Sequence, residues 1–159
     1  MLGVSRWEKV GVRNYDLGVK KNSASEGIKP NTSVLILNRG AIMYQSYENL
    51  EVWTKAVGLS VLVYSKFNHC RDFGFKDQIC RSAVSVPSNI AEGMERDSVK
   101  ETIRFLHIAK GSCAECRTQL LIASKIGYLN EQEYIDLKHE AETISRMMHS
   151  LINSLKPNP

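Results

Sequence analysis

Two cysteines three residues apart, Cys113 and Cys116, have the spacing of half a zinc site. Such a thiolate pair needs further cysteine or histidine ligands. The chain offers Cys70, Cys80, His69 and His107. Structural zinc pairs usually lie on turns, whereas Cys113 and Cys116 fall on the apolar stripe of a predicted helix, where free cysteine packs as a small hydrophobic residue. We therefore predict core packing for this pair, with no metal and no cofactor.

A second group that could do chemistry is a basic row, in which Arg96, Lys100 and Arg104 recur every four residues and His107 continues the series. On a helix this spacing gathers the side chains on one face. Two interpretations stay open. The row could follow the phosphates of a nucleic acid, with repetition in an oligomer multiplying a weak site. It could equally be a solvated face whose charges pair with nearby glutamates.

Catalysis has little support in the sequence. Glu92, Glu95 and Asp97 cluster at a predicted turn, but acidic residues near the start of a helix are common because they complement its dipole. The spacing suggests no set of serine, histidine and carboxylate. We expect no enzymatic activity and no small-molecule substrate.

Four helices are predicted to position these residues, over about 47–68, 75–92, 98–127 and 130–155. Ser98 with Glu101, and Asn130 with Glu133, have the spacing of capping boxes that start the last two helices. Gly127 is predicted to end the third helix. Because the connections are short, neighbouring helices should be antiparallel, as in an up-and-down four-helix bundle.

The first helix carries two adjacent apolar stripes, which is more apolar surface than one neighbour can cover. The first stripe contains Leu50, Trp53, Val57, Val61 and Tyr64, and the second contains Val52, Ala56, Leu59 and Val63. Two explanations stay open. Either the helix is central in the bundle, or the second stripe packs against another subunit.

The segment Ser85-Val-Pro-Ser-Asn-Ile-Ala-Glu-Gly93 sets a proline inside the second helix. Pro87 should bend the helix and leave the carbonyl of Ala83 without its usual donor, at a cost of roughly 3 kcal/mol unless another group bonds it. The side chains of Ser85, Ser88 and Asn89 are candidates for that bond. Asn89 would then serve the fold, whereas Glu92 could pair with Arg96 or Arg104 across a subunit boundary. Gly93 is predicted to end the helix in the left-handed conformation.

These motifs resemble a known family, the four-helix-bundle proteins of the 23S ribosomal RNA intervening sequence (S23 type). The similarity runs from about Tyr47 to Lys156 and includes, in the family's order, Tyr47-Glu-Asn-Leu-Glu-Val-Trp53, the segment 87–93, Gly111-Ser112, Thr118-Gln-Leu120 and Gly127-Tyr-Leu129. The resemblance implies a small bundle that assembles as a homopentamer, similar to the accessory protein of diversity-generating retroelements, which binds nucleic acid. It implies no enzymatic activity.

Charge is distributed unevenly along the 159 residues. The net charge of +4 lies wholly in residues 1–42, which hold seven basic and three acidic residues and leave 14 of each for residues 43–159. We read 1–42 as a basic, poorly structured extension of the bundle 43–159, and translation starting at Met43 is a second hypothesis. No apolar run is long enough for a membrane span, so we expect a cytoplasmic protein.

Two functions are consistent with these observations. The first is a homo-oligomeric scaffold or adaptor associated with RNA or DNA, with ribosomal RNA as one candidate target and Arg96, Lys100 and Arg104 contacting phosphates. The alternative is a protein-interaction module that binds no nucleic acid. The resemblance favours the first, and the neutral charge of 43–159 favours the second.

Overall fold

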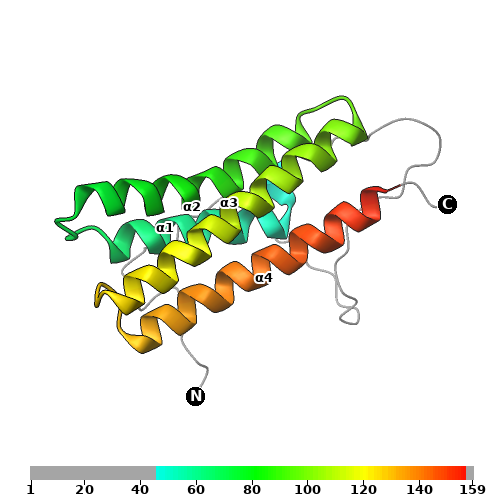
Figure 1. Cartoon of the computed structure of the whole chain (residues 1–159). Coiled ribbons are helices and arrows are strands. Elements are labelled where there is room, and N and C mark those ends of the chain that lie inside the picture. Colours follow the sequence, from blue (N-terminus) through cyan, green and yellow to red (C-terminus); the bar gives the residue numbers. More distant parts are fainter. Residues whose placement is uncertain (1–45, 157–159) are drawn as a thin grey trace, which may run out of the picture. The chain divides into compact units, whose positions relative to one another are not determined.

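The chain folds into four helices preceded by one 3-10 turn, in a computed structural model that describes residues 46–156. The turn is η2 (Tyr47–Asn49), and the helices are α1 (Glu51–Lys66), α2 (Phe73–Met94), α3 (Val99–Lys125) and α4 (Glu131–Leu155). Consecutive helices lie side by side and α4 packs on α1 (Figure 1). The predicted all-α, up-and-down bundle is confirmed. The extension 1–42 and the alternative start at Met43 lie outside the described residues.

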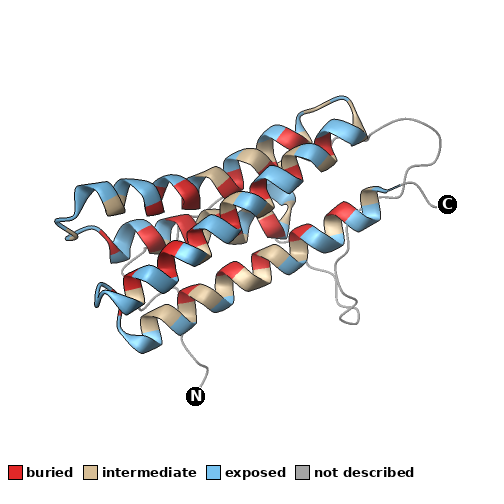
Figure 2. Cartoon of the chain, in the orientation of Figure 1, coloured by how far each residue is buried: buried red, intermediate tan, exposed pale blue. Residues whose placement is uncertain are grey.

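The core runs along the shared axis of the four helices, and each helix turns one buried stripe toward it (Figure 2). Its largest fully buried side chains are Phe67, Leu59, Ile79, Ile90, Leu106, Leu120, Ile144, Met148 and Ile152. Burial of such side chains, at about 1.5–3 kcal/mol each, is the main favourable contribution to folding.

The two stripes of α1 have different environments. The second stripe, which includes Val52, Ala56, Leu59 and Val63, is buried inside this chain. The idea that it packs against another subunit is therefore wrong, because α2 and α4 already cover it. In the first stripe, Val61 is 43% exposed and Tyr64 is 52% exposed. Leu50 and Trp53 of the same stripe pack against the core, so only the Val61–Tyr64 end of it is exposed within residues 46–156.

The connection between α3 and α4 follows the prediction closely. Gly127 has a φ of 80°, and the N–H groups of Tyr128 and Gly127 donate to the carbonyls of Ala123 and Ser124 over 2.8 and 3.3 Å. These are the two bonds of a Schellman motif. Asn130 and Glu133 then form the predicted capping box at the start of α4.

The capping box predicted at the start of α3 is wrong. Ser98 occupies the cap position, but its side chain makes no cap hydrogen bond. Instead, its carbonyl accepts from both the N–H and the hydroxyl of Thr102, over 2.9 and 3.2 Å. The backbone of Ser98 is extended, with φ −118° and ψ 122°, as at an ordinary cap position, so the difference lies in the orientation of its side chain.

Candidate nucleic-acid interface

The predicted basic row lies at the turn between α2 and α3. Arg96 belongs to the connection, while Lys100 and Arg104 lie on the first two turns of α3. Lys100 and Arg104 are exposed and Arg96 is half-buried. Because α3 begins only at Val99, the three residues do not form one helical face, and the structure separates Arg96 from the other two.

Arg96 fastens the end of α2 to the start of α3. Its guanidinium forms an ion pair with Glu92 one turn earlier, and its Cζ lies 4.8 Å from the centroid of the Phe105 ring. The Nε atom is buried and has no hydrogen-bond partner within residues 46–156. The ion pair is worth about 0.2–1 kcal/mol because it is exposed, and the cation–π contact adds a similar amount. Arg96 is thus engaged within the chain.

Lys100 and Arg104 differ from Arg96 in having free charged ends. Within the described part of the chain, neither side chain takes part in an ion pair, a side-chain hydrogen bond or a ring contact. The N-terminus of α3 adds a partial positive charge from its backbone N–H groups. These two side chains can therefore meet an anion without first breaking a contact.

The carbonyl freed by Pro87 does find a partner, on another helix. The hydroxyl of Ser60 in α1 donates toward the carbonyl oxygen of Ala83 over 2.9 Å. Its one proton is shared with the carbonyl of Ala56, also at 2.9 Å, but Ala56 keeps its own helical donor. The prediction that Ser85, Ser88 or Asn89 would satisfy Ala83 is wrong, since these side chains bond other groups. The bend at Pro87 stays a prediction.

Asn89 bonds Ser85 one turn earlier in α2, and Ser85 connects this helix to α3. Its Nδ2 donates to the carbonyl and the hydroxyl oxygen of Ser85, over 2.7 and 3.0 Å. The Ser85 hydroxyl in turn lies 2.9 Å from the hydroxyl of Ser112 on α3. This arrangement favours the interpretation of Asn89 as a residue that serves the fold.

Gly93 does not end α2, because the helix continues to Met94, and Gly127 is the only positive-φ glycine within residues 46–156. Gly93 is needed for a different reason. A Cβ atom at this position would lie 2.8 Å from the Cβ of Phe105 and 3.3 Å from the carbonyl oxygen of Thr102. The backbones of α2 and α3 approach so closely here that no side chain fits. The left-handed conformation predicted for Gly93 is therefore wrong.

The sequence did not predict one buried polar contact between α2 and α3. The hydroxyl of Ser82 donates to Oε1 of Gln119 over 2.6 Å, and Nε2 of Gln119 donates to Glu115 over 3.3 Å. Ser82 and Gln119 are both buried. The available signal was a glutamine beside the apolar stripe of α3, within the segment Thr118-Gln-Leu120. A buried amide must find a hydrogen-bond partner, and Ser82 supplies it.

The cysteines pack as predicted. Cys113 and Cys116 are fully buried, and Cys113 donates a weak hydrogen bond to the carbonyl of Ala141 over 3.2 Å. Burial raises the pKa of the Cys113 thiol to about 11 and that of Cys116 to about 12, so both stay protonated at neutral pH. Among residues 46–156 no three His, Cys, Asp or Glu side chains gather as metal ligands would.

None of the helices in the described region combines the length and the apolar character that a membrane crossing requires. The four antiparallel helices, with a polar turn and a buried polar contact between α2 and α3, define an all-α bundle. Residues 48–150 match the sequence model of the family described as 23S rRNA-intervening sequence protein, and the chain belongs to that family.

A similar bundle is known from a crystal structure. It is that of a protein with unknown function from the S23 ribosomal protein family of Bacteroides thetaiotaomicron. The two chains are 25% identical and align with a TM-score of 0.61 over 64% of this chain and 97% of the other. No curated protein matches the chain. The family expected from the sequence is confirmed.

Proposed function

We propose that this protein is a non-enzymatic, cytoplasmic scaffold or adaptor that self-associates, as a homopentamer, and holds nucleic acid on its surface. Ribosomal RNA is the first candidate target because the family is described by the 23S rRNA intervening sequence. The observation that carries the proposal is the pair of exposed, unengaged cations Lys100 and Arg104 at the start of α3.

Two cations per chain make a weak site, and assembly would strengthen it. Each cation that neutralises a phosphate releases condensed counterions, so binding falls as salt rises. A ring of five copies would present the pair fivefold, and linked weak contacts can raise affinity by orders of magnitude. Arg96 contributes less directly, because Glu92 and Phe105 already hold its guanidinium.

The residue assignment is tested by reversing the charge of the pair in the full-length protein. We expect Lys100→Glu with Arg104→Glu to weaken binding of a fluorescent 23S rRNA fragment at least tenfold. The slope of log K against log salt should fall by about two, one for each lost contact. The matched control is Arg71→Glu with Lys125→Glu, which makes the same change of charge at exposed positions at the opposite end of the bundle. Equal losses in both double variants would contradict the assignment.

A protein-interaction module is the second candidate, and the charge balance of residues 43–159 favours it. Sedimentation velocity of the full chain at 260 and 280 nm separates the two functions, if the protein is purified at low salt without nuclease. An assembly whose excess 260 nm absorbance disappears in high salt supports the nucleic-acid scaffold. An assembly with a clean protein spectrum supports the interaction module, and a monomer contradicts the assembly on which both functions depend.

A further inference from the structure

Charge is segregated over the bundle, although residues 43–159 are neutral as a whole. The first half of α3, residues 99–112, carries three Lys or Arg residues and one acidic residue. The last part of the described chain, residues 143–156, carries two Lys or Arg residues and no acidic residue. These two segments together have a net charge of +4, which leaves nine basic and thirteen acidic residues for the rest of 43–159.

The two segments lie beside each other because α3 and α4 are antiparallel neighbours (Figure 1). Arg117 of α3 pairs with Glu142 of α4 over 3.0 Å, which fixes the register of the two helices. Lys110 comes two turns before Arg117, and His149 comes two turns after Glu142. Lys110 is therefore level with His149. At this level a histidine stands where the carboxylate of Glu142 stands two turns away.

We call this surface the α3–α4 basic face and define it by its five Lys and Arg residues: Lys100, Arg104, Lys110, Arg146 and Lys156. Lys110 is half-buried and the other four are exposed. Within residues 46–156, none of the five forms an ion pair. Arg146 and Lys156 bond only neutral groups of α4, a threonine hydroxyl and an asparagine amide oxygen.

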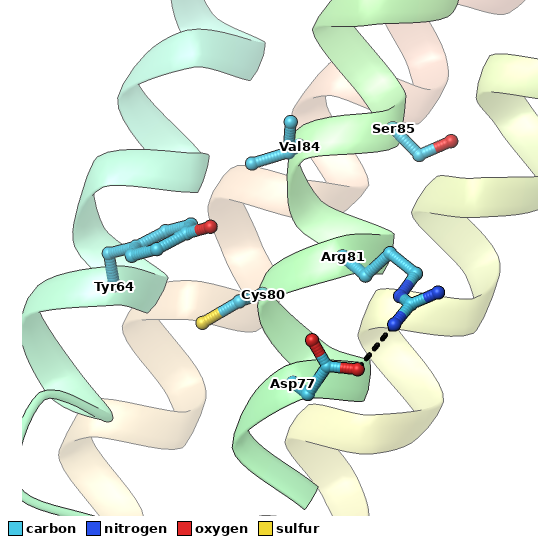
Figure 3. Close-up of a pocket in the computed structure, with 6 residues that line it drawn as sticks. All are labelled: Tyr64, Asp77, Cys80, Arg81, Val84 and Ser85. Carbon is cyan, nitrogen blue, oxygen red and sulfur yellow. Dashed lines mark hydrogen bonds and ion pairs between the residues drawn. The ribbon is translucent and has the colours of Figure 1, made fainter. Parts of the chain in front are cut away.

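Outside the α3–α4 basic face, six Lys and Arg side chains of the described residues pair with carboxylates. Arg81 is one of them: it borders an open hollow with Tyr64, and its guanidinium pairs with Asp77 (Figure 3). On α3 itself, Glu101 lies five turns before Gln119, which bonds α2, so Glu101 is on the side of α3 that faces α2. The cations of the basic face therefore keep their charge unneutralised.

We propose that the α3–α4 basic face holds the phosphate backbone of a nucleic-acid strand along its length. The inference rests on the nucleic-acid binding in the proposed function and extends the pair Lys100 and Arg104 to a site that spans two helices. Lys100 and Lys110 are separated by about 15 Å along α3. Over that distance one strand of a duplex carries about four phosphates, one per 3.4 Å. A strand laid along this face therefore has a phosphate near the level of every cation.

The α3–α4 basic face has no platform on which a base could stack. Stacking of bases requires accessible aromatic side chains. The only aromatic residue of the two segments is Phe105, which is half-buried and has the Arg96 guanidinium over its ring. Contacts from Lys and Arg to phosphates position a nucleic acid but carry no sequence information. We therefore expect binding at this face to depend on salt and to be independent of base sequence.

Charge reversal at positions that the proposed function does not use tests the inference in the full-length protein. We expect Lys110→Glu with Arg146→Glu to weaken binding of the fluorescent 23S rRNA fragment about tenfold and to lower the slope of log K against log salt by about two. An unrelated RNA of the same length should lose the same factor, because the lost contacts are to phosphates. Lys110→Gln with Arg146→Gln removes the same two cations without adding acidic groups, and it should lower the slope equally.

The matched control is again Arg71→Glu with Lys125→Glu, at exposed positions of the opposite end of the bundle. Far-UV circular dichroism should show the same helix content in all variants. If Lys100→Glu with Arg104→Glu loses binding while the variants of Lys110 and Arg146 bind like the control, the extended face is overturned and the proposed function stands.

Three other outcomes are also decisive. A loss confined to one RNA sequence overturns the contact with the backbone. If a poly-glutamate peptide binds with the same dependence on Lys110 and Arg146 and RNA does not bind, the face belongs to an acidic protein partner and the inference is overturned. A wild type that binds no RNA and no DNA at low salt overturns the proposed function itself.

Discussion

Ser60 should be worth far more to this protein than a helical serine normally is, because its hydroxyl satisfies the carbonyl that Pro87 leaves without a donor. Ser60 is 7% exposed and Ala83 is fully buried, so water cannot replace the bond after Ser60→Ala. Leaving a buried carbonyl unsatisfied costs about 1–3 kcal/mol. The neighbouring acceptor, Ala56, loses nothing comparable because it keeps its backbone donor. We therefore expect Ser60→Ala to lower the free energy of unfolding by about 2 kcal/mol.

The cause of this loss can be isolated with a double-mutant cycle. Pro87→Ala restores a backbone N–H four residues after Ala83, which makes the Ser60 hydroxyl redundant. In that background Ser60→Ala should cost less than about 1 kcal/mol, so the coupling energy should be about 1 kcal/mol or more. The control is Ser88→Ala, which removes an exposed hydroxyl that bonds the carbonyl of Val84 over 2.9 Å and should change stability by less than about 0.5 kcal/mol.

Urea unfolding followed by far-UV circular dichroism measures all four corners of the cycle. Protein concentration must be the same throughout, since self-association adds to apparent stability. The melting temperature should fall by roughly 4 °C for each kcal/mol. An equal cost of Ser60→Ala in the presence and absence of Pro87 would refute the reasoning, because the hydroxyl would then be stabilising something other than the freed carbonyl.

Two further predictions concern glycine and pH. Gly93→Ala should destabilise the bundle by about 1–3 kcal/mol because its Cβ would lie 2.8 Å from that of Phe105. Gly111→Ala should instead stabilise a monomeric sample by about 0.5–1 kcal/mol, because alanine favours the helix and its Cβ would meet nothing within 4 Å. If both variants changed the free energy of unfolding in the same direction in urea titrations, the packing described would be contradicted. The pKa of Glu133 is lowered, first by its hydrogen bond from Lys66 and then by the N–H of Asn130. A lowered pKa in the folded state gives stability that is present above the unfolded value of 4.5 and is lost as pH falls through the folded value. The stability difference between wild type and Glu133→Gln should therefore be largest near neutral pH and shrink below 4.5; a difference independent of pH would count against this role of the carboxylate.

Much of the fold follows from local patterns that can be read along one helix at a time. The Asn130–Glu133 capping box and the end of α3 at Gly127 were both predicted, because each involves residues within a few positions of one another. The apolar stripe that contains Cys113 and Cys116 was also predictable, since helical periodicity alone puts it in the core.

The errors concern contacts between helices. Gly93 was assigned to a helix end because glycine often serves there, but its role depends on Phe105 of the next helix. Ser60 was overlooked because nothing near it in sequence links it to Pro87. The burial of Ser82 and Gln119 has the same origin. Such pairings depend on how far two helices are rotated and shifted against each other, and a single sequence does not specify those quantities.

In the candidate site, too, features within one helix were predictable and contacts between elements were not. Regular spacing grouped Arg96 with Lys100 and Arg104, and it could not reveal that Arg96 precedes the helix and lies over Phe105. Exposure of Lys100 and Arg104 was predictable from the polar side of α3. The sequence could not show that Lys100 and Arg104 form no ion pair within residues 46–156, because several glutamates lie near them and only the structure shows that Glu92 pairs with Arg96.

The contact between α2 and α3 also limits how the two helices can move. A slide by one turn, about 5.4 Å, would separate Ser85 from Ser112 and Ser82 from Gln119 together. In one direction, the slide would also bring Asn89, which has a side chain, toward the place beside Phe105 where the backbone of Gly93 now fits. The two helices therefore pack well in one register only. These contacts therefore favour movement of α2 and α3 together, as one hairpin, over sliding of one helix along the other.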